Sequence, residues 1–161
     1  MAKPKTQAMA IIETMFDSKA TGCWDDLNAL AMDAESLMLS ITKVSPILRN
    51  TELCACVPDR KGLLAAATLV DTDARAFRNE LNQLKALHAG HTGGSVNPDE
   101  LANTLSIGME YTNWIERYQQ TVLPNIGAIL DYANEGAHIY EAKVAAAAAA
   151  ETVKTEVAEN V

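Results

Sequence analysis

The most regular hydrophobic pattern of the chain lies between residues 59 and 89. Apolar or seam positions there alternate steps of four and three residues: Leu63, Ala67, Val70, Ala74, Phe77, Leu81, Leu84 and His88. This heptad spacing predicts one amphipathic helix over residues 59–89. Such a helix is about 45 Å long at 1.5 Å per residue.

Two shorter patterns precede this helix. Residues 5–19 carry apolar side chains on one predicted helical face, and Thr21-Gly22 is expected to break that helix. A second helix is expected from near Trp24, with a seam of Leu27, Leu30, Ala34, Leu37, Ile41, Val44 and Leu48. Pro46 is expected to kink this helix or to end it shortly before, and residues 50–58 to form a connector.

The pattern after residue 89 predicts a loop and then more helix. Residues 89–95 have loop composition, and Asn97-Pro98 followed by two acids is a favourable helix start. The apolar face continues as Leu101, Leu105, Gly108, Tyr111, Ile115, Tyr118 and Val122, then as Ile126, Leu130, Ala133, Ala137, Tyr140 and Val144. Because Pro124 interrupts this face, it predicts either one long kinked helix or two helices in series.

These elements predict an all-α fold. We expect an elongated helical bundle built on long antiparallel helices, an αα-hairpin around residues 59–144, with the N-terminal helices packed against it. Residues 1–144 are expected to form one domain. Residues 145–161 form an Ala-rich tail of low complexity that either extends the last helix or frays. Long helices with narrow seams often complete their core by association, so a homo-oligomer or a subunit of a larger assembly is expected.

The amino-acid composition agrees with a helical fold, and the distribution of charge makes some classes of binding partner unfavourable. Alanine supplies 27 of the 161 residues and aromatics only 5%, which favours helix over strand. The formal net charge is −8, and residues 96–161 hold 3 basic against 10 acidic side chains. This charge disfavours nucleic acid as a partner of the C-terminal part. The sequence shows no apolar run long enough for a membrane span, so a cytoplasmic protein is expected.

No set of residues predicts catalysis or a cofactor. Cys54-x-Cys56, with His88 and His91 near a helix end, are weak metal-binding candidates, because zinc sites usually show wider Cys pairs and a second close pair. No nucleophile elbow or phosphate-binding loop occurs in the sequence. We therefore expect neither a metal ion nor an enzyme activity.

One concentrated basic area stands out on the helix predicted over residues 59–89. It consists of Arg60, Lys61, Arg75, Arg78 and Lys85. This area is suited to contact phosphates or an acidic surface of a neighbouring subunit, and its plain alternative is a solvated face. Tyr111, Trp114 and Tyr118 lie at helical spacing and are expected to pack in the core rather than stack on bases.

The leading functional hypothesis is a non-catalytic structural or assembly protein that acts through helical interaction surfaces. Small, Ala-rich, helical chains without catalytic motifs are common among accessory and virion proteins of tailed phages, so a virus particle is a second expected location. One alternative is a nucleic-acid-associated accessory protein that uses the basic helix face. Another is a small acidic inhibitor or adaptor of a host protein.

Overall fold

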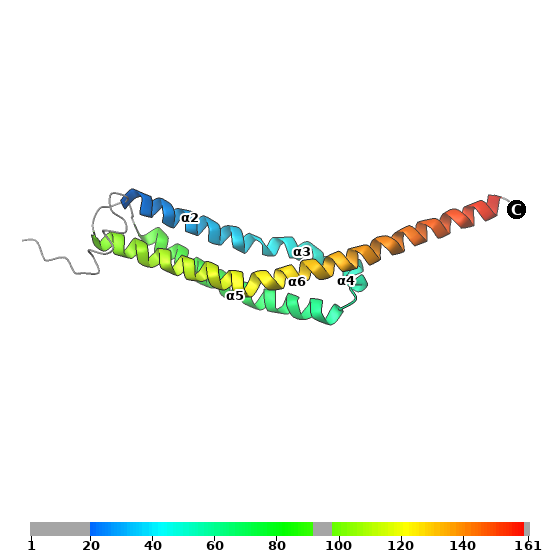
Figure 1. Cartoon of the computed structure of the whole chain (residues 1–161), viewed down its shortest axis with the longest axis horizontal. Helices are drawn as coiled ribbons and strands as arrows, with labels where there is room; N and C mark the ends of the chain where they lie inside the picture. Colours follow the sequence, from blue (N-terminus) through cyan, green and yellow to red (C-terminus); the bar gives the residue numbers. More distant parts are fainter. Residues whose placement is uncertain (1–19, 92–97, 160–161) are drawn as a thin grey trace, which may run out of the picture. The chain divides into compact units, whose positions relative to one another are not determined.

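The computed structural model of this chain describes residues 20–91 and 98–159, and these residues are helical almost throughout (Figure 1). The helices in chain order are α2 (Ala20–Leu39), α3 (Ile41–Arg49), α4 (Thr51–Cys56), α5 (Arg60–Gly90) and α6 (Pro98–Glu159). The described part of the chain contains no strand, so the all-α prediction is confirmed. The helix predicted over residues 5–19 lies outside the described residues.

The described helices divide into two compact units. The first unit contains α2, residues 73–90 of α5 and residues 98–121 of α6. The second unit contains α3, α4, residues 60–72 of α5 and residues 122–159 of α6. Each unit has its own buried apolar side chains, described separately below.

The core of the first unit is built from aromatic and aliphatic side chains of three helical segments. Its buried members are Cys23, Leu27, Ala34, Met38, Phe77, Leu81, Leu84, Leu101, Tyr111, Trp114 and Tyr118. Tyr111, Trp114 and Tyr118 are completely buried, which confirms them as packing residues. Three of the unit's largest side chains thus lie on α6, where the sequence placed the apolar face.

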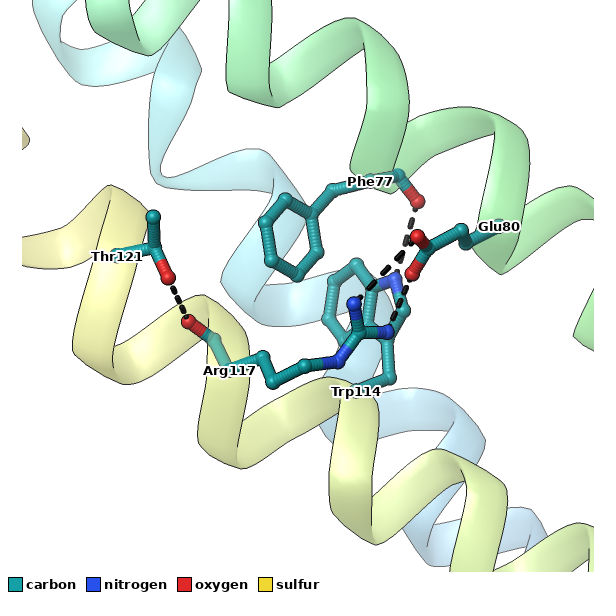
Figure 2. Close-up of polar contacts among 5 residues, drawn as sticks. All are labelled: Phe77, Glu80, Trp114, Arg117 and Thr121. Carbon is teal, nitrogen blue, oxygen red and sulfur yellow. Dashed lines mark hydrogen bonds and ion pairs between the residues drawn. The ribbon is translucent and has the colours of Figure 1, made fainter.

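Figure 2 shows how the aromatic core of this unit joins α5 to α6. The Trp114 indole N–H donates a hydrogen bond to the backbone carbonyl of Phe77 at 3.0 Å, and the two rings meet edge to face. Trp114 also stacks on Tyr118, with ring centroids 5.1 Å apart. Arg117 covers the Phe77 ring and forms an ion pair with Glu80. The indole nitrogen therefore enters the core with its hydrogen bond satisfied.

The core of the second unit is aliphatic and smaller. Its buried side chains are Val44, Val57, Leu63, Ala66, Val70, Val122, Ile126, Ile129 and Ala133. Asp59 connects two of its helices, because its carboxylate accepts the Gly62 backbone N–H at the start of α5 and the Tyr132 hydroxyl of α6. The bond from the Gly62 N–H explains why α5 begins at Arg60, directly after the capping aspartate, and the bond from Tyr132 joins this start to α6.

The two long helices largely match their predicted bounds. Helix α5 covers nearly the whole of residues 59–89, and its predicted seam positions 63, 70, 77, 81 and 84 are buried. Helix α6 is one continuous helix, with Pro124 inside it, and it extends through the Ala-rich segment to Glu159. Proline removes only one backbone donor, and the buried positions on both sides of Pro124 hold the helix together.

Two predicted helix boundaries near the N-terminal part are wrong. Thr21 and Gly22 lie inside α2, which begins at Ala20, and the break between α2 and α3 falls at Ser40 rather than beside Pro46. Pro46 lies inside α3. Pro46 is in the second turn of this nine-residue helix, and it removes one backbone hydrogen-bond donor. Ser40 itself keeps right-handed helical dihedral angles.

The connector predicted over residues 50–58 contains a short helix instead, α4. Asn50 ends α3 by donating its backbone N–H to Ile47, and its side chain accepts the Leu53 N–H to begin α4. Such local capping is difficult to recognise in a six-residue segment that has no apolar periodicity. The helix packs on α6 at Gly136, where an added Cβ would lie 3.1 Å from the Leu53 carbonyl oxygen.

Candidate functional site

The predicted basic residues are all exposed on α5, but they divide between the two units. Arg60 and Lys61 lie in the second unit, and Arg75, Arg78 and Lys85 in the first. Lys85 forms an ion pair with Glu35 of α2. Because both partners are about half exposed, this pair contributes little to stability, but it offsets part of the positive charge. A binding role for the five residues stays a prediction.

The metal-binding candidates do not assemble into a site within the described ranges. Cys54 lies on α4, where its thiol donates to the Ile47 carbonyl, and Cys56 lies at the end of the same helix. His88 and His91 belong to the first unit. Among residues 20–91 and 98–159, no group of three or more His, Cys, Asp or Glu side chains is arranged to hold a metal ion.

The two histidines instead join a cluster around Trp24, a residue that no sequence motif marks as functional. The Trp24 ring centroid lies 5.0 Å from that of His88 and 5.7 Å from that of His91. Together with Met32 and Lys85, these side chains line a concavity of about 550 Å³. Two imidazoles beside apolar side chains are fewer ligands than a zinc site requires. No sequence signal marks this concavity, because it forms only where α2 meets the end of α5.

Hydrogen bonds join the two imidazoles to α6. Burial raises the pKa of Tyr111, so its hydroxyl keeps its proton, and this hydroxyl lies 3.4 Å from Nδ1 of His88. The Thr104 hydroxyl donates to the backbone carbonyl of Glu100, so its oxygen can accept from Nε2 of His91 at 2.6 Å. Each ring is thus held against α6 through one of its nitrogens.

Acidification below neutral pH is expected to destabilise the first unit through His88. Burial, and to a smaller extent the neighbouring His91, lowers the pKa of His88 below its ordinary value. The unfolded chain then binds more protons than the folded chain, so the free energy of unfolding falls as the pH falls through about 6.5 toward the folded-state pKa. Urea unfolding measured between pH 7.5 and 5.5 checks this.

The matched control is His88→Gln, whose amide oxygen still accepts from Tyr111 but does not titrate. The variant is expected to lose less stability than the parent over the same pH range. A parent chain that gains stability on acidification, or loses no more than His88→Gln, would show that His88 has no such effect.

Among the residues that the structure describes, the longest run of exposed positions is the C-terminal part of α6. Every residue from 141 to 158 is exposed, whereas the helix is still partly buried at Tyr140, whose hydroxyl donates to Glu52. In Figure 1 this part of α6 is a continuous helix, and no other labelled helix of its unit lies beside it. Its 18 residues form about 27 Å of helix with no cover from the described part of the unit.

One side of this exposed helix is apolar. At about 100° per residue, six apolar side chains project within roughly a third of the circumference. We call them the Val153 face: Ala142, Ala146, Ala149, Ala150, Val153 and Val157. Val153 and Val157 are 57% and 60% exposed, and Val144 projects from the opposite side. The sequence pattern continued the apolar face only as far as Val144 and did not indicate the Val153 face.

Comparisons with protein-family models, with curated proteins and with solved structures give no match to this chain. Within the described residues, none of the helices combines the length and the apolar character needed to cross a membrane. A function can therefore be inferred only from the surfaces of the chain itself.

Proposed function

We propose that this chain is a non-catalytic assembly protein that associates through helical surfaces, above all the Val153 face. The observation that carries the proposal is the exposed helix over residues 141–158. Most helical stability in proteins comes from the packing of an apolar face, and no described side chain of its unit packs on this one. A partner that covers its apolar side would stabilise it and bury the two exposed valines.

The finer architecture of this proposal is an αα-hairpin of antiparallel helices. The order of contacts in the first unit supports it: Phe77 of α5 packs on Tyr118 of α6, and His88 packs on Tyr111. Residue numbers rise along one helix as they fall along the other, as in an antiparallel pair. The setting of the assembly, the cytoplasm or a phage particle, stays a prediction.

The nucleic-acid alternative has weaker support. It depends on five exposed basic residues, of which Lys85 is already paired with Glu35. The Val153 face has an uncharged centre, and the exposed helix around it carries more acidic than basic side chains. Neither feature attracts phosphate.

Light scattering of the full chain at micromolar concentration tests the proposal. We expect a mass above the 17.3 kDa of one chain. The double variant Val153→Asp with Val157→Asp is expected to weaken association at least about tenfold, because it places charge where valine would be buried. The matched control, Val144→Asp, changes an exposed valine on the opposite side of the same helix and is expected to leave the mass unchanged.

A parent chain that is monomeric at this concentration would overturn the proposed function. If the parent chain is an oligomer and the double variant keeps the same mass as Val144→Asp, the Val153 face is not the surface through which the chains associate. Circular dichroism of each variant shows whether the helices remain folded, since all three valines are exposed and their replacement is expected to leave the cores intact.

A further inference from the structure

We infer that the partner on the Val153 face is the same segment of a second copy of this chain, lying parallel and in register. This inference rests on the proposed function and adds the identity and the orientation of the partner. It is carried by two observations: an apolar face that no described side chain of its unit covers, and the placement of charged side chains on the two flanks of this face.

The apolar face is suited to close contact between two identical helices. Its centre consists of alanines, whose small side chains let helix axes approach closely, and the bulkier Val153 and Val157 follow toward the C-terminal end. In a parallel pair in register, Ala146 meets Ala146 and Val153 meets Val153 of the second copy. Small side chains then face small ones, and valines face valines, along the whole contact.

The charged flanks favour the parallel orientation. Lys143 and Lys154 project from one flank of the Val153 face, and Glu156 projects from the other. In a parallel pair, the flank with lysines faces the partner flank with Glu156, so Lys154 of one copy lies opposite Glu156 of the other, twice by symmetry. In an antiparallel pair, like flanks meet and Lys143 lies close to Lys154 of the second copy. Like charges thus oppose the antiparallel arrangement.

No ion pair between described residues already engages these charges. Within residues 20–91 and 98–159, neither Lys154 nor Glu156 has an ion-pair partner. The two residues are two positions apart in one helix, a spacing at which side chains do not face each other. Any coupling between them must therefore come from a second chain.

Disulfide cross-linking of the full chain tests the orientation. In a Cys54→Ser, Cys56→Ser background, Ala146→Cys is expected to give a disulfide-linked dimer under mild oxidation. Cys23 is retained because it is buried, and burial raises the pKa of its thiol, which keeps it unreactive. The matched control is Ala148→Cys, which makes the same exchange on the opposite side of the helix and is expected to stay monomeric on a non-reducing gel.

A mixture of Ala146→Cys and Val153→Cys chains distinguishes the two orientations by intact mass. Parallel pairing in register gives the two homodimers, whereas antiparallel pairing of residues 141–158 places residue 146 opposite residue 153 and gives the mixed dimer. A mixed dimer in place of homodimers would overturn the parallel arrangement while leaving the proposed assembly function intact. An oligomer with no cross-link at either position would overturn the second copy as the occupant of this face.

Charge exchange gives an independent measurement. Lys154→Glu and Glu156→Lys are each expected to raise the dissociation constant about three- to tenfold, because two attractive pairs become repulsive. The double exchange is expected to restore it, and the differences are expected to shrink at high salt. If the double exchange raises the dissociation constant by the product of the two single effects, Lys154 does not pair with Glu156 of the second copy. A monomeric parent chain is a different outcome, because it would overturn the proposed assembly function as well.

Discussion

Replacing Trp114 by alanine is expected to lower the free energy of unfolding by about 3–5 kcal/mol. The side chain is 0% exposed, and it packs against both Phe77 and Tyr118. Its removal leaves a cavity in the centre of the first unit, because two aromatic rings lose their largest neighbour at once. Since domains are typically stable by 5–15 kcal/mol, the loss is a large part of the total. Urea unfolding followed by circular dichroism measures it.

Two further variants separate the causes of this loss. Trp114→Phe keeps an aromatic ring but lacks the N–H that donates to Phe77, so we expect a smaller loss of about 1–2 kcal/mol. Gln120→Ala, at an exposed position of the same helix, is expected to change stability by less than about 0.5 kcal/mol. A loss for Trp114→Ala no larger than that for Gln120→Ala would show that the aromatic cluster does not hold this unit together.

Replacing Gly136 by alanine is expected to destabilise the second unit by about 1–3 kcal/mol. A Cβ at this position would lie 2.8 Å from Cγ2 of Val57 and 3.1 Å from the Leu53 carbonyl oxygen. The carbonyl belongs to the backbone of α4, so it cannot turn aside as a flexible side chain would. The added methyl group must therefore push α4 and Val57 away from α6. Thermal unfolding of the full chain measures the effect.

The same exchange at Gly127 is the matched control, because both glycines lie in the interior of α6. A Cβ at Gly127 meets no described atom within 4 Å. Alanine there is expected to stabilise the chain by about 0.5–1 kcal/mol, since glycine is the poorer helix former. Equal effects of the two exchanges would mean that the close approach of α4 at Gly136 does not matter.

Local sequence signals predicted the two long helices well. The seam from Leu63 to His88 repeats so regularly that helical periodicity alone defines α5, and Asn97-Pro98 marks the start of α6 at Pro98. Signals from single residues were less reliable. Gly22 and Pro46 lie within helices although breaks were expected beside them, because contacts elsewhere in a helix can outweigh the cost of one unfavourable residue. Pro124 lies within one long helix, which was one of its two predicted alternatives.

The candidate sites also divide into those that the sequence pattern indicates and those that depend on contacts between helices. The exposed basic side chains of α5 could be identified from the sequence, because an amphipathic helix turns its charged positions outward. The Trp24 concavity could not be identified from the sequence, because it depends on where α2 meets residues 88 and 91. The Val153 face was equally hidden, because a run of alanines has no polarity of its own to mark one side as apolar.

The sequence by itself determined that the chain is helical, where its two long helices run and which of their side chains are apolar. Those properties follow from periodicity and helix propensity, which act over neighbouring residues. Only the tertiary structure decided which apolar side chains are covered: those around Trp114 are buried, whereas Val153 and Val157 stay exposed. Burial depends on contacts between distant segments, so a local pattern shows that a face is apolar but not whether the chain itself supplies its partner.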